Sequence, residues 1–127
     1  NIAGCEALGD ATVSAVFRQH QLVSLSIAGL EDVGAATCDE LSAQVRLEAL
    51  WAAGCIGIPT SGWCALNLPS LRTLSLAGCA VDDAAIMRLT VRSPLLTALT
   101  LRSCKLLTRN GLHSIALGLP ALTDLNV

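Results

Sequence analysis

Apolar residues recur along the chain with a period of 24 to 26 residues. The segments LPSLRTLSLAGC (68–79) and SPLLTALTLRSC (93–104) share the pattern P-x-L-x-x-L-x-L-x-x-C, and the same frame fits the rest of the chain. The second leucine of this pattern falls at Leu25, Leu50, Leu74, Leu99 and Leu125. Alternation of apolar and polar positions over so few residues predicts one short, half-buried strand in each period.

Each period has a second apolar half, about eight residues beyond the position that closes the strand pattern. Pairs spaced i, i+3 predict a short amphipathic helix there: Val13/Val16, Cys38/Leu41, Trp63/Leu66, Ile86/Leu89 and Leu112/Ile115. Pro69, Pro94 and Pro120 follow such segments and end them. In the third period Pro59 and Gly62 fall where the helix should start, so this helix is expected to be the least regular.

One unit of strand and helix cannot bury both its apolar faces alone, whereas stacked units can. We therefore expect an α/β solenoid of about five repeats, with a parallel sheet on one side and short helices on the other. Asn1, Ile2, Asn126 and Val127 fall at strand positions, and no polar terminal cap is recognisable. We expect residues 1–127 to form a single domain that is an excerpt of a longer array.

The chain resembles the leucine-rich-repeat proteins, and most closely their cysteine-containing subfamily, over essentially all of its length. The segments LAGCAVDDAAIMRL (76–89) and LRSCKLLTRNGLHSIA (101–116) carry the resemblance, with a strand, a closing cysteine, a polar turn and a helix start. Departures are local: Leu30 replaces the closing cysteine, and Ala52 replaces a larger aliphatic residue. The resemblance implies a right-handed horseshoe fragment with the parallel sheet on its concave face and the helices on its convex face.

Composition narrows the possible functions. Apolar residues are 53% of the chain and charged residues 14%, which excludes a disordered chain. The net charge of −2 gives no reason to expect a nucleic-acid partner. The uncharged run 49–71 is interrupted by several Pro and Gly residues, so no membrane span is expected. Residues 1–66 carry a net charge of −5 and residues 67–127 carry +3. Such a gradient could orient a partner, but we favour the interpretation that these are scattered, solvated charges.

The chain has six cysteines, at positions 5, 38, 55, 64, 79 and 104. Their spacing lacks the C-x₂₋₄-C pairs typical of zinc sites, and it shows no local pairing pattern for disulfides. Cys5, Cys55, Cys79 and Cys104 instead occupy the closing position of the repeat, where a small, weakly polar side chain packs and contacts backbone groups. We expect no metal and no cofactor, and free buried thiols favour an intracellular setting, cytoplasmic or nuclear.

No catalytic constellation is recognisable, so we expect no enzyme activity. His20 and His113 lie several repeats apart, and His113 falls on a helix face expected to be exposed. Asp82 and Asp83 suit a helix start, where carboxylates accept backbone N–H bonds. There is no nucleophile elbow, phosphate-binding loop or H-E-x-x-H motif.

What remains is binding of a protein partner through the face of the sheet that the helices leave open. The residues expected on this face are Trp51, Ser26, Thr73, Ser75, Thr100, Arg102, Asp124 and Asn126. Trp51 is the only aromatic residue among the outward strand positions; alternatively it rolls toward the space beside Ala52. We favour Trp63 as the residue that fills this space and Trp51 as a contact residue.

The family resemblance implies two roles for such a face. One is substrate recognition in an F-box-type ubiquitin ligase, although no F-box is recognisable in this chain. The other is that of a structural or adaptor subunit in a large assembly, for example of the cytoskeleton. Both imply further repeats or flanking domains of the same protein.

Overall fold

The computed structural model describes residues 2–5, 9–19 and 21–127, so that Asn1 and His20 lie outside the described residues. Helices and three-residue strands alternate along it. The helices are α1 (Asp10–Gln19), α2 (Ala35–Ser42), α3 (Thr60–Ala65), α4 (Asp83–Arg92) and α5 (Arg109–Gly118). The strands are β1 (Ser24–Ser26), β2 (Ala49–Trp51), β3 (Thr73–Ser75), β4 (Ala98–Thr100) and β5 (Asp124–Asn126).

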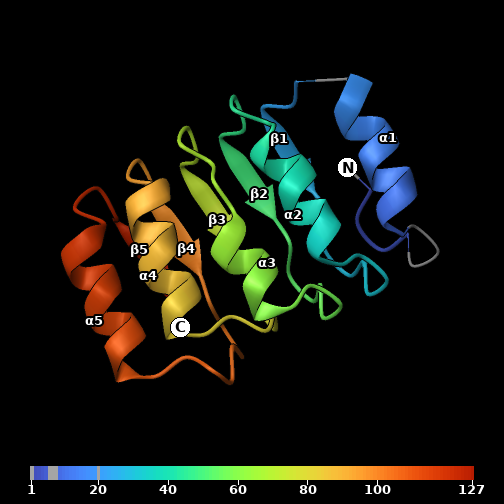
Figure 1. Ribbon diagram of the computed structural model, residues 1–127. Helices are drawn as coiled ribbons and strands as arrows, with labels where there is room; N and C mark the ends of the chain where they lie inside the picture. The colour runs from blue at the N-terminus through green and yellow to red at the C-terminus, as the bar shows by residue number, and fades with distance from the viewer. Residues whose placement is uncertain (1, 6–8, 20) are drawn as a thin grey trace.

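The five strands form one parallel sheet in the order β1-β2-β3-β4-β5. The second leucines of the pattern lie side by side in register, as the repeat predicts: Leu25, Leu50, Leu74, Leu99 and Leu125. The helices lie beside one another along one face of the sheet (Figure 1). The α/β class and the parallel sheet are thereby confirmed, and the arrangement is consistent with a repeat solenoid.

A tight turn follows each of β1 to β4, at the residue before the closing position, and Gly4 makes the same turn before α1. The backbone there is left-handed, with φ between 72° and 76° at the glycines of this position: Gly4, Gly29, Gly54 and Gly78. Ser103 takes the same place after β4 with φ 60°, the one left-handed residue other than glycine in the described chain. A side chain with a Cβ atom is strained in this conformation, so the turn after β4 carries a local energetic cost.

The core lies between the sheet and the helices, and nearly every predicted column is buried there. Val13, Cys38, Trp63 and Ile86 are buried, but Leu112 is 37% exposed, and its predicted burial is wrong. A Cβ atom on Gly111 or Gly118 would meet side-chain atoms of α4, which shows that these glycines make the contact with α4. Leu112 is turned away from that contact and lines a hollow with Leu122 and Leu125.

Three more positions of the repeat pattern are exposed rather than buried, namely Cys5, Leu125 and Val127. Each lies in the first or last strand unit of the described chain, where a neighbouring unit covers it on one side only. The third helix is the shortest, with six residues against eight to ten in the others. This confirms the effect predicted for Pro59, which stands at the N-cap of α3.

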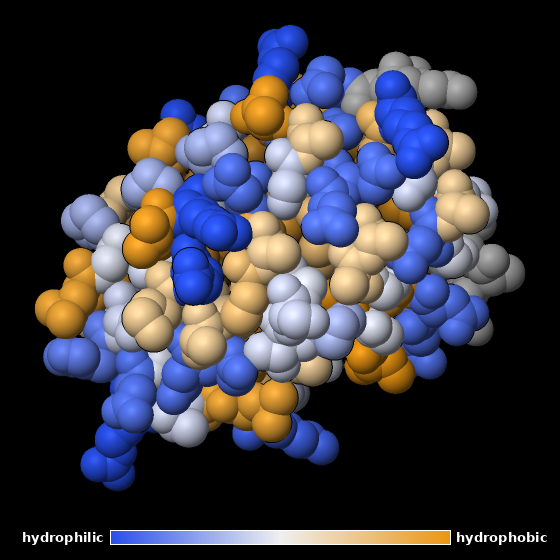
Figure 2. Space-filling model, viewed as in Figure 1, coloured by the Kyte–Doolittle hydropathy of each residue, from blue (hydrophilic) through white to orange (hydrophobic). Residues whose placement is uncertain are grey.

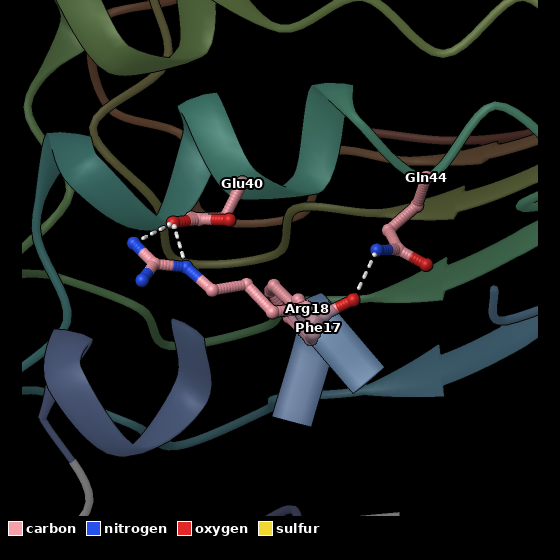
Figure 3. A network of polar contacts seen from close by, with 4 residues as sticks. All are labelled: Phe17, Arg18, Glu40 and Gln44. Atoms are coloured by element: carbon pink, nitrogen blue, oxygen red, sulfur yellow. Dashed lines mark hydrogen bonds and ion pairs between the residues drawn. The ribbon is translucent and has the colours of Figure 1, made fainter. Parts of the chain in front are cut away.

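Polar side chains join the first two repeats. The amide of Gln44, which is almost fully buried, donates from Nε2 to the carbonyl of Phe17 at 3.0 Å and accepts at Oε1 from the backbone N–H of Leu22 at 2.9 Å. Figure 3 shows Gln44 reaching Phe17 at the end of α1, and beside it the ion pair between Arg18 and Glu40 at 3.1 Å. Gln44 therefore satisfies two backbone groups that the helix end would otherwise leave without a partner.

Replacing Gln44 by Leu is expected to lower the free energy of unfolding by about 2 kcal/mol, because each of two backbone groups loses its hydrogen bond in a buried place. Urea unfolding followed by circular dichroism measures the change. Glu40→Gln is the matched control, since it removes only the exposed ion pair to Arg18 and is expected to cost less than about 1 kcal/mol. Equal losses in the two variants would contradict this account.

Candidate protein-binding face

We call the sheet face turned away from the helices the open face. It consists of the first and third residues of each strand, because the middle leucines of the strands point to the helices. The third residues form one row in register: Ser26, Trp51, Ser75, Thr100 and Asn126. The first residues form a second row: Ser24, Ala49, Thr73, Ala98 and Asp124.

All eight residues predicted for a binding site lie together on or beside this face. Five of them make up the whole third-residue row, and Thr73 and Asp124 belong to the first-residue row. Arg102 follows β4 by two residues and is exposed. Most of these side chains are short, so the backbone of the sheet is accessible to a close partner.

Trp51 is the exception on this face. Its side chain is 40% exposed, and its partners in register on either side are Ser26 and Ser75. Trp63 is 2% exposed and belongs to the core cluster, together with the fully buried Ala52. The structure thus places Trp51 outward and Trp63 inward, and a Trp51 rolled into the space beside Ala52 is not what it shows.

Among the described residues, the helix side of the molecule offers no comparable feature. Figure 2 shows that hydrophobic residues there are scattered among hydrophilic ones. Exposed apolar residues of the helices include Met87 and Val91 on α4 and Leu117 on α5. Singly scattered apolar residues are ordinary on a protein surface and do not indicate a site.

Charges are sparse on and around the open face. Glu48 and Arg72, which precede β2 and β3, form an exposed pair at 4.0 Å. Arg102 and Asp124 are exposed, and neither makes an ion pair within the described chain. Exposed pairs of this kind contribute little to stability, so these charges remain available to a partner.

Three of the cysteines at the closing position link their own repeats to the preceding ones. The Sγ atoms of Cys55, Cys79 and Cys104 donate to the carbonyls of Ile27, Ala52 and Leu76 at 3.2, 3.0 and 3.2 Å. The predicted packing of these side chains against backbone groups is confirmed at these three positions.

Burial raises the pKa of the Cys55 thiol to about 11, and that of the Cys38 and Cys79 thiols to about 12. At neutral pH these thiols are therefore protonated, and thiols in that state are poor nucleophiles and poor metal ligands. The six cysteines are all free. Within the described residues no three His, Cys, Asp or Glu side chains gather as a metal ion would require.

The acidic pair at the start of α4 holds two helix ends. Asp82 accepts the N–H of Ala85 at 2.8 Å and caps α4, as predicted. Asp83 accepts hydrogen bonds from the hydroxyl and the backbone N–H of Thr108, the N-cap of α5, and these bonds lower the pKa of its carboxyl.

His113 is exposed on α5. In the described part of the chain, no helix is long and apolar enough to span a membrane.

One feature of the surface was not predicted from the sequence. A hollow of about 310 Å³, which we call the loop pocket, opens between the loops that follow β2, β3 and β4. Its walls are Ile56, Gly78, Cys79, Ala80, Ser103, Lys105 and Leu106. The signal in the sequence was a large side chain one or two residues after a closing cysteine, at Ile56 and Leu106, whereas the unit between them has Ala80 after its cysteine.

Comparison with known proteins gives a match of fold. No protein-family model matches the chain, and no curated protein matches it. A chain in the crystal structure of the Rad7 and Elc1 complex in yeast superposes with a TM-score of 0.82 at 25% sequence identity. The superposition covers 96% of this chain and 33% of that chain. This chain therefore spans about a third of the length of the yeast chain that it resembles.

Proposed function

We propose that the chain is a non-catalytic protein-interaction module, and that its open face binds a protein partner with Trp51 as the anchor. The observation that carries this proposal is the exposed indole of Trp51 within a row of short side chains. Tryptophan is enriched among the residues that dominate binding energies, and short neighbours let a partner's backbone approach. The yeast structure, a complex of two proteins, supports a role in protein binding.

The family is part of this proposal. A leucine-rich-repeat horseshoe of the cysteine-containing type is supported by the leucines in register and by the thiol bonds between repeats. For this family the finer role that we propose is substrate recognition in an F-box-type ubiquitin ligase inside the cell. That role rests on the resemblance in sequence and on the likeness to a chain of the Rad7 and Elc1 complex.

Replacing Trp51 by Ser is expected to weaken binding of the partner by about 2 kcal/mol, or roughly 30-fold in Kd, while the melting temperature stays unchanged. Affinity purification with quantitative mass spectrometry first identifies proteins that the wild-type chain retains. The purified candidate is then titrated against both forms. Met87→Ser is the matched control, because Met87 is also a large exposed apolar residue but lies on α4, on the other side of the molecule.

Two results would count against the proposal. A large fall in melting temperature for Trp51→Ser would mean that the indole is part of the core, and equal binding by Trp51→Ser and wild type would remove Trp51 from the interface. The identity of the partner then decides the finer role. A protein that becomes ubiquitinated in dependence on this chain supports the ligase, whereas a component of a large assembly supports an adaptor.

A further inference from the structure

The loop pocket lies beyond the open face and combines two properties, apolar walls and positive charge. Its first property is apolar: Ile56 and Leu106 stand on its walls with 59% and 52% of their surface exposed. They come from loops 50 residues apart in the chain, which the repeat brings to the same edge of the sheet. Two large apolar side chains that flank a hollow leave room for a third between them.

The second property is positive charge. Lys105 lines the pocket, and the backbone of Arg102 adjoins it, since the N–H of Gly78 in the pocket wall donates to the Arg102 carbonyl at 2.8 Å. Neither cation makes an ion pair within the described chain. At the other end of the same edge, the loop after β1 carries the exposed acids Glu31 and Asp32. The sign of the charge thus reverses along the edge.

We propose that the loop pocket binds a short acidic–apolar segment of a protein partner, with an apolar side chain between Ile56 and Leu106 and a carboxylate at Lys105. The charge supports this choice, because a carboxylate gains charge-assisted hydrogen bonds from Lys105, whereas a basic segment is repelled there. Cys79 in the wall takes no chemical part, since its thiol is bonded to the Ala52 carbonyl. The proposal does not depend on Trp51, which lies on the sheet itself.

A library of random seven-residue peptides displayed on phage tests the proposal on the whole chain. Enriched peptides are expected to carry a large apolar residue next to Asp or Glu. Their affinity, measured by fluorescence polarisation of the labelled synthetic peptide, is expected to fall at least tenfold in Lys105→Glu and in Leu106→Ser. Arg109→Glu and Leu117→Ser are the matched controls on α5 and are expected to stay within twofold of wild type.

Charge reversal provides a stricter readout. A peptide with its acid replaced by Lys is expected to lose binding to wild type and to regain it on Lys105→Glu. Enriched peptides that carry no acid, peptides that are insensitive to both loop variants, or the absence of any enriched peptide would overturn the proposal. If Trp51→Ser abolished the binding of the enriched peptides and Leu106→Ser did not, the peptides would occupy the open face. That result would overturn this inference but would leave the proposed function standing.

Discussion

Between pH 9 and about pH 11 the free energy of unfolding is expected to fall by roughly 4 kcal/mol for each pH unit. The cause is the three thiols of Cys38, Cys55 and Cys79, whose pKa burial raises from the ordinary 9.0 to about 12, 11 and 12. At a pH between the unfolded and the folded pKa of a thiol, the unfolded chain has released a proton that the folded chain keeps. Each such thiol lowers the free energy of unfolding by about 1.4 kcal/mol per pH unit. Below pH 9 the thiols are protonated in both states, so their full contribution to stability is present.

The three thiols together remove about 11 kcal/mol by pH 12, so a domain with a stability of about 5–11 kcal/mol would unfold between roughly pH 10 and 12. Urea titrations at several pH values from 7 to 10.5, followed by circular dichroism, measure the slope. Cys79→Ala is expected to reduce the slope by about a third, even though it also lowers stability at neutral pH by removing the bond to Ala52. Cys5→Ala, at an exposed position, is the control and keeps the wild-type slope. A slope that Cys79→Ala leaves unchanged would contradict the assignment.

Replacing Gly57 by Ala is expected to lower the free energy of unfolding by about 3 kcal/mol or more. A Cβ atom built on Gly57 would lie 2.2 Å from the carbonyl oxygen of Glu31 and 2.6 Å from that of Val33. Both are backbone atoms, so no side-chain rotation relieves the overlap, and the loop after β2 has to move away from the loop after β1. The loss would appear as a fall in melting temperature of about 10 °C.

Gly9→Ala is the control for this substitution. The nearest atom to its Cβ position is the carbonyl oxygen of Asp32 at 3.8 Å, an ordinary contact. Gly9 precedes α1, so alanine there weakens only the helix cap, at a cost of up to about 1 kcal/mol. If the two variants melted at the same temperature, the close approach of the two loops would be wrong.

Features that recur in every repeat could be predicted from the sequence. The leucine register, the outward position of Trp51 and the inward position of Trp63 follow from a period that five units share, since each unit supports the alignment of the others. The backbone contacts of the closing cysteines were predicted for the same reason. The identity of the carbonyl that each thiol meets required the structure, because it belongs to the preceding repeat.

Features that occur once left no periodic signal. Gln44 holds the end of α1, whereas the three following repeats have Leu68, Ser93 and Leu119 at that place. The exposure of Leu112 depends on which side of α5 meets α4, and Gly111 and Gly118 decide it through close packing. The loop pocket arises where Ile56 and Leu106, far apart in sequence, interrupt the pattern near each other in space. Departures from the repeat, rather than the repeat itself, mark the candidate sites.

The one-to-one register of the strands has a consequence for how such a protein evolves. Within the described chain, helices contact only the helices of adjacent repeats, and strands only the adjacent strands. In β1 to β4 each outward side chain is thus held by the buried leucine of its own strand, and a change at one position leaves the backbone of the others in place. A surface of this kind can acquire a new specificity one residue at a time without losing its fold. Trp51 has the form of such a change, a single large residue where the other strands carry Ser, Thr or Asn.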